Sequence, residues 1–99
     1  MTSPERPFRI LYAGNNLALF KFISDSLSDC FVVRCPDKLT ARTLIKGMNY
    51  SLLLFDDELL DIELESFSRS RRSCTPVLIY RKEDDFNQLV ESIIRQLPG

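Results

Sequence analysis

The chain has 99 residues, of which 44% are hydrophobic and 27% charged, and its formal net charge is -1. This length and balance predict one globular domain that folds without a metal or disulfide staple. The near-neutral charge argues against a dedicated nucleic-acid-binding protein. The absence of histidine excludes Ser-His-Asp and Cys-His catalysis and any histidine-ligated metal. No apolar run approaches the roughly 20 residues of a membrane span, and the first residues lack a signal-peptide core, so we expect a cytoplasmic protein.

Residues 1–7 predict a flexible arm. After this arm, the first half of the chain alternates short apolar runs with amphipathic stretches. Residues 8–13 predict a strand, and the polar residues 14–16 predict a turn that can start a helix. Apolar residues at helical spacing mark that helix: Leu19 or Phe20, Ile23 and Leu27. Residues 30–35 are rich in β-branched and aromatic side chains, as in strands. A second helix is predicted to begin at Pro36-Asp37, with a buried stripe of Ala41, Leu44, Ile45 and Met48.

The second half repeats the alternation. Residues 51–55 are the most hydrophobic stretch, and their lack of alternation predicts a central parallel strand covered on both faces. This strand ends abruptly in three acidic residues, 56–58. Residues 61–72 predict a weaker helix and residues 76–80 a fourth strand. An acidic run then precedes the last helix, as the helix dipole favours, and the apolar stripe of that helix comprises Phe86, Leu89, Ile93 and Leu97.

Alternating strand and helix patterns predict an α/β domain over residues 8–97, with a doubly wound parallel sheet. We expect four strands in this domain. Residues 98–99 end the domain or begin a linker. In such folds, the functional crevice lies beyond the carboxyl ends of the strands, so chemistry is expected at the polar residues that follow them.

The sequence resembles the receiver domains of bacterial two-component response regulators over roughly residues 8–82. Residues 9–13 are similar to the opening strand of a receiver, and residues 75–79 are similar to the fourth. Residues 50–56, Tyr-Ser-Leu-Leu-Leu-Phe-Asp, resemble the strand that ends in the phosphoacceptor aspartate. The resemblance implies a flavodoxin-like fold, with the four strands in the order 2-1-3-4 and a fifth βα unit missing or displaced. It also implies a role in phosphorelay signal transduction. It places the phosphoacceptor-equivalent position at Asp56.

The sequence departs from the receiver pattern at the positions that carry the chemistry. Receivers hold magnesium between an acidic pair after the first strand and the acceptor aspartate. Carried over, that pair falls on Gly14 and Asn15, neither of which can be negatively charged, and the hydroxyl position falls on Arg81. The lysine that normally ends a fifth strand has no clear counterpart. Because magnesium needs carboxylates as well as water and phosphate oxygens, we expect no metal and no cofactor.

These departures predict a degenerate receiver that is not an enzyme and regulates through protein contacts, without phosphorylation. Arg81 or Lys82, one strand away from Asp56, is expected to neutralise that carboxylate as a fixed internal ion pair. One alternative is a working phosphorelay receiver that binds Mg²⁺ and is phosphorylated on Asp56 by a histidine kinase. A second alternative is a small nucleotide-binding or enzymatic α/β subdomain, against which the absence of histidine and of a glycine-rich loop weighs.

Partner contacts are expected where the missing unit leaves the sheet open. Without a fifth strand, residues 76–80 form an apolar sheet edge, which invites pairing with another chain. The partner is expected to be another protein, an output domain or a second copy of this chain. The predicted contact surface is the fourth strand or the last helix, through Phe86, Leu89, Ile93 and Leu97. Neither nucleic acid nor a membrane is expected to bind this domain.

Overall fold

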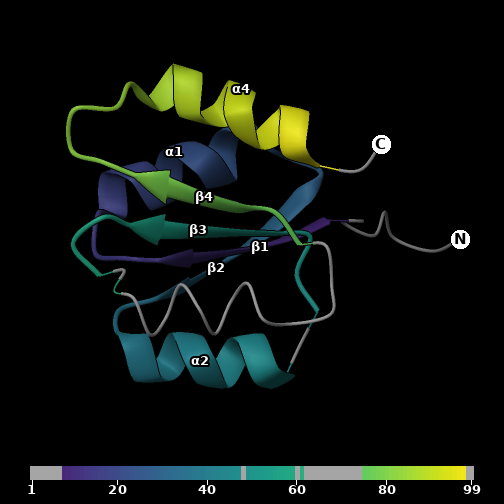
Figure 1. Ribbon diagram of the computed structural model, residues 1–99. Helices are drawn as coiled ribbons and strands as arrows, with labels where there is room; N and C mark the ends of the chain where they lie inside the picture. Colours follow the sequence, from purple (N-terminus) through teal and green to yellow (C-terminus); the bar gives the residue numbers. More distant parts are fainter. Residues whose placement is uncertain (1–7, 48, 60, 62–74, 98–99) are drawn as a thin grey trace, which may run out of the picture.

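The computed structural model describes residues 8–47, 49–59, 61 and 75–97. In chain order, its elements are β1 (Phe8–Ala13), α1 (Leu17–Ser26), β2 (Cys30–Cys35), α2 (Lys38–Gly47), β3 (Leu52–Asp56), β4 (Val77–Tyr80) and α4 (Phe86–Gln96). Strand and helix alternate from β1 to β3, and β4 leads through a short turn into α4 (Figure 1). The helix predicted over residues 61–72 lies, apart from Asp61, outside the described residues, so it stays a prediction.

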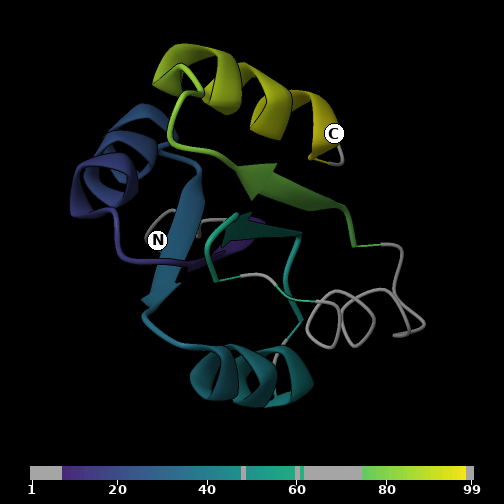
Figure 2. The ribbon, with the colours of Figure 1, turned by 60° about the vertical axis from the view of Figure 1, so that its left-hand side comes forward.

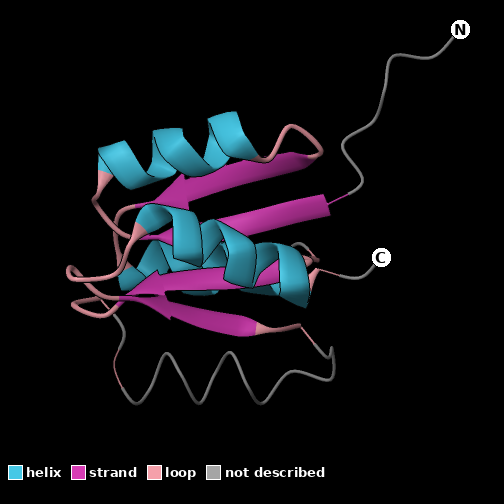
Figure 3. Ribbon diagram, turned by 90° about the horizontal axis from the view of Figure 1, so that it is seen from above, coloured by secondary structure: helices cyan, strands magenta, loops and turns pink. Residues whose placement is uncertain are grey.

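The four described strands form one parallel sheet in the order β2-β1-β3-β4. The arrowheads in Figure 3 point to the same side of the molecule. This arrangement confirms the predicted α/β class, strand direction and strand order, and it is consistent with a flavodoxin-like fold. The central strands β1 and β3 are paired in register from Ile10 with Leu52 to Ala13 with Phe55. The loops after β1 and β3 therefore leave the same edge of the sheet side by side.

Helices cover both faces of the sheet. Figure 2 shows α1 and α4 on one side of the strands and α2 on the other. On the side of α1 and α4, the core contains Tyr12 of β1 and Leu54 of β3. Their neighbours Leu11 and Leu53 belong to a second core cluster, which contains residues of α2. Because successive strand residues point to opposite faces, a strand buried on both sides must be apolar throughout, as the sequence predicted for residues 51–55.

Two polar side chains fix the starts of α1 and α2. The Asn16 side chain caps α1, where its Oδ1 accepts a hydrogen bond of 3.0 Å from the Leu19 backbone N–H. The Asp37 carboxylate accepts one of 2.7 Å from the Thr40 N–H, and this bond lowers the pKa of Asp37. Such caps satisfy N–H groups that have no partner within the helix. The Asn16 cap also places the turn 14–16 at the mouth of the β1–β3 crevice.

The apolar stripe of α4 packs against the sheet of its own chain, which corrects the prediction that this stripe is an interaction surface. Ile93 is fully buried and Leu89 is 7% exposed, and Phe86 and Leu97 are partly buried against the same core. The amphipathic pattern was identified correctly, but its partner is the α1–α4 face of the sheet. The large apolar side chain that α4 presents outward is Ile94, which is 54% exposed.

Candidate functional site

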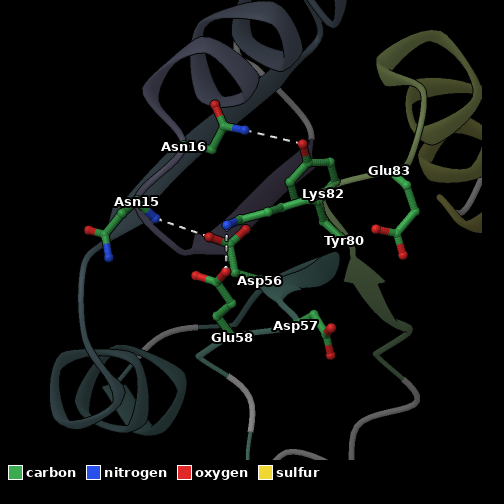
Figure 4. Close-up of a pocket in the computed structure, with 8 residues that line it drawn as sticks. All are labelled: Asn15, Asn16, Asp56, Asp57, Glu58, Tyr80, Lys82 and Glu83. Atoms are coloured by element: carbon green, nitrogen blue, oxygen red, sulfur yellow. Dashed lines mark hydrogen bonds and ion pairs between the residues drawn. The ribbon is translucent and has the colours of Figure 1, made fainter.

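Polar side chains from three loops meet beyond the carboxyl ends of β1, β3 and β4 (Figure 4). They line a pocket of about 330 Å³ formed by Asn15, Asn16, Asp56, Asp57, Glu58, Tyr80, Lys82 and Glu83. The pocket lies at the β1–β3 boundary, where the strand order changes direction. Ligand sites of open α/β sheets occur at this switch point. The structure thus brings Asp56 and Asn15 together, as the sequence predicted.

Asp56 is the last residue of β3, and both of its carboxylate oxygens accept hydrogen bonds from the β1 side. The Tyr12 hydroxyl donates to Oδ1 over 2.7 Å. The Asn15 backbone N–H donates to Oδ2 over 3.2 Å. Two donors therefore hold the carboxylate against the β1–α1 turn, and each donor comes from a segment more than 40 residues away in the chain.

Tyr12 was not predicted as a site residue, yet it links the site together. Its ring is fully buried, and its hydroxyl also accepts a hydrogen bond of 3.1 Å from the Asn16 backbone N–H. Burial, followed by the hydrogen bond to Asp56, raises the pKa of Tyr12 far above its ordinary value. The phenol therefore stays protonated at neutral pH and acts as the donor to Asp56. The available sequence signal was a tyrosine among the apolar residues 10–13, because a buried phenol needs a polar partner.

Tyr80, the last residue of β4, joins the network through Asn16. The Asn16 Nδ2 donates to the Tyr80 hydroxyl over 3.1 Å, while its Oδ1 caps α1. One asparagine thus connects the start of α1 to the end of β4. The hydrogen-bonded network of Tyr12, Asn16, Asp56 and Tyr80, together with the Asn15 N–H, ties the ends of all three strands together.

Gly14 is required by the close approach of Asp56. A Cβ atom at this position would lie closer than 3.0 Å to the Asp56 carboxylate and 2.6 Å from the Tyr12 hydroxyl. The described backbone contains no glycine with a positive φ, so lack of space, and not backbone conformation, excludes a side chain here. The Gly14 carbonyl also accepts a hydrogen bond of 3.2 Å from Arg34 of β2.

The predicted ion pair between Asp56 and Arg81 or Lys82 is not what the structure shows. Lys82 Nζ lies 3.0 Å from Glu58 Oε1, and the hydrogen bond to Glu58 raises the pKa of Lys82. Both of these side chains are exposed, so the pair contributes little to stability. Arg81 uses its backbone N–H, which donates over 2.9 Å to Asp84 Oδ2. The physical reason is direction: the Asp56 carboxylate faces the β1–α1 turn, where Tyr12 and Asn15 bind it.

The carboxylates of the pocket are not arranged as ligands of one cation. Asp56, Asp57, Glu58 and Glu83 all line it. Within the described ranges, no group of three or more His, Cys, Asp or Glu side chains is placed to hold a metal ion. Among the same residues, no helix is long and apolar enough to cross a membrane.

The fold and the site together define a parallel α/β domain with a hydrogen-bonded aspartate at its switch point. Comparison of the chain with models of known protein families and with curated protein sequences found no match.

Proposed function

We propose that this chain is a receiver-like regulatory module that acts through protein contacts and not through phosphorylation of Asp56. The observation that carries the proposal is the double hydrogen bond to the Asp56 carboxylate, from the Tyr12 hydroxyl and the Asn15 N–H. The strand order β2-β1-β3-β4 and an aspartate at the end of β3 support the receiver-like part. Gly14 and Asn15, in place of an acidic pair, support the loss of phosphorylation.

Charge and hydrogen bonding both oppose phosphoryl transfer to Asp56. To attack a phosphoryl group, a carboxylate oxygen of Asp56 would have to give up or share its hydrogen bond from Tyr12 or Asn15. The incoming phosphoryl dianion would also enter a pocket lined by the carboxylates of Asp57, Glu58 and Glu83. Two like charges about 4 Å apart repel by roughly 1–4 kcal/mol, depending on the local dielectric. A barrier raised by that amount slows a reaction by about one to three orders of magnitude.

In this proposal the module is cytoplasmic, is not an enzyme and binds neither nucleic acid nor a membrane. Its partner is a protein, an output domain or a second copy of the chain. The side of the sheet at β4 supports a protein contact. Among the described strands β4 lies at the edge of the sheet, and its residues Val77 to Ile79 are only partly buried. An edge strand with apolar side chains is a common template for pairing.

Incubation of the full chain with acetyl phosphate and Mg²⁺ is expected to leave its intact mass unchanged. The physical reason is that two donors hold Asp56 and that the described carboxylates near it are not arranged to hold a metal ion. Intact-mass spectrometry is the measurement, and a receiver domain with a complete acidic pair serves as the positive control. A gain of one phosphoryl group that disappears in Asp56→Asn would contradict the proposal. The same gain in mass in the wild type and in Asp56→Asn would show that a residue other than Asp56 is modified.

A further inference from the structure

A groove runs along the outer edge of the sheet, between β4 and α4. It has a volume of about 320 Å³ and is lined by Leu78, Ile79, Glu83, Asp84, Asp85, Gln88, Leu89 and Ser92. Its apolar part comes from Leu78 and Ile79 of β4 and Leu89 of α4. Its acidic part comes from the turn 83–85, which follows the carboxyl end of β4. Figure 1 shows β4 as the outermost labelled strand beneath α4.

The backbone of β4 offers unused hydrogen-bonding groups toward this edge. The Leu53 N–H donates to the Pro76 carbonyl, and the Asp57 N–H donates to the Tyr80 carbonyl. The backbone groups of successive strand residues point to opposite sides of the strand. The N–H and C=O of Leu78 therefore also point to β3, whereas those of Val77 and Ile79 point outward. Within the part of the chain that the structure describes, no strand pairs with this outer side of β4.

The open edge ends at a defined residue. The Arg81 N–H donates to the Asp84 side chain, and its carbonyl accepts a hydrogen bond from the Asp84 N–H, each over 2.9 Å. The turn therefore occupies both backbone groups of Arg81. The unused groups of Val77 and Ile79 form a short edge that an added strand of a few residues can cover.

Charge indicates what kind of strand fits. Three carboxylates, Glu83, Asp84 and Asp85, lie at one end of the groove, and none of the described residues that line it is basic. Lys82, the nearest cation in the sequence, pairs with Glu58 on the other side of the turn. An occupant with apolar side chains over Leu78 and Leu89, and Arg or Lys beside the acidic turn, would complement both parts of the groove. Exposed charge pairs of this kind add modestly to affinity and more to specificity.

We propose that this groove binds an extended segment of a partner protein, which adds to β4 as a strand and places Arg or Lys at the acidic turn. This inference rests on the proposed function, since it specifies the chemistry of the protein partner. Backbone bonds to Val77 and Ile79 supply the strand pairing, and the groove and acidic turn select the side chains.

Two labelled peptides test the groove with the full chain: acetyl-Thr-Val-Thr-Val-Thr-Arg-Arg-amide for parallel addition and its reversed sequence for antiparallel addition. Fluorescence anisotropy is expected to show saturable binding of at least one of them, weakened by added salt. Glu83→Gln is expected to weaken binding about two- to fivefold, as for one exposed charge pair. Glu91→Gln is the matched control, because Glu91 is an exposed residue of α4 outside the groove, and it should leave affinity unchanged.

A second variant tests the backbone pairing. Ile79→Pro removes an outward N–H without removing a bond to β3, since proline is tolerated on the free side of an edge strand. It is expected to weaken binding at least about tenfold while circular dichroism and the melting temperature show a folded chain. If Ile79→Pro unfolds the chain, the Glu83→Gln and Glu91→Gln comparison still decides the question.

Three results would overturn the groove assignment. One is no binding of either basic peptide, and another is equal binding of peptides with Glu-Glu in place of Arg-Arg. The third is a concentration-dependent dimer that loses its contact in Ile79→Pro, which would assign the edge to a second copy. These outcomes are separate from the proposed loss of phosphorylation, because the peptide measurements do not depend on Asp56 and the intact-mass measurement does not depend on the groove.

Discussion

Replacing Ile93 by Asp is expected to destabilise the folded chain severely. Ile93 is fully buried in the core between α1, α4 and the sheet. The substitution removes an apolar side chain worth about 1.5–3 kcal/mol and buries a carboxylate with no partner. Together these costs amount to at least about 3–5 kcal/mol, a large part of the 5–15 kcal/mol that typically stabilises a domain. Urea denaturation followed by far-ultraviolet circular dichroism measures the loss.

Ile94→Asp is the matched control for this prediction. Ile94 is the next residue of the same helix and is 54% exposed, so the substitution should change the free energy of unfolding by no more than about 0.5 kcal/mol. If Ile93→Asp kept its stability and instead dissociated a dimer, the stripe of α4 would be an interface and not part of the core. That result would restore the original sequence-based prediction for this helix.

Gly14→Ala is expected to lower the free energy of unfolding by about 2–3 kcal/mol, the combined cost of overpacking and of a disturbed buried hydrogen bond. The added methyl group would collide with the Asp56 carboxylate and the Tyr12 hydroxyl. At least one of these groups must move, so the bond between them is strained or lost. Urea denaturation monitored by circular dichroism gives the change.

Two companion variants separate this collision from a general effect of alanine. Gly47→Ala places the methyl group where no atom lies within 4 Å, at the end of α2. It should be neutral or stabilise the chain by up to about 1 kcal/mol, because alanine favours the helix. Adding Asp56→Ala to Gly14→Ala should recover part of the loss, since it removes one partner in the collision. Equal destabilisation by Gly14→Ala and Gly47→Ala would argue against the close contact at Gly14.

The fold could be predicted because its signals are local and agree with one another. The short apolar run at residues 8–13 indicates a strand, and the lack of alternation at residues 51–55 indicates a strand covered on both faces. Alternating strands and helices indicate a parallel sheet. The strand order followed from the resemblance to receivers and is confirmed by the pairing of β1 with both β2 and β3. The stripe of α4 could be identified but not its partner, because a core face and an interface have the same apolar spacing.

The site could be predicted in outline and not in its connections. Asp56 was placed correctly at the end of a central strand, beside the turn that contains Gly14 and Asn15. The role of Tyr12 could not be read from the sequence, because its partner is 44 residues away and the bond depends on the register of β1 with β3. Lys82 was assigned to Asp56 by proximity alone, whereas the side-chain directions pair it with Glu58.

Asp56 serves as a structural hydrogen-bond acceptor for Tyr12, and a double-mutant cycle measures the strength of this bond. The free energies of unfolding of the wild type, Tyr12→Phe, Asp56→Ala and the double variant give the coupling between the two side chains. Tyr12→Phe removes the hydrogen bond from the Asn16 N–H whether residue 56 is Asp or Ala. The cost of losing that bond therefore cancels in the cycle. We predict a coupling of about 1.5–3 kcal/mol, as for a hydrogen bond to a charged group. A coupling near zero would mean that the Tyr12 hydroxyl does not hold the Asp56 carboxylate in the folded chain.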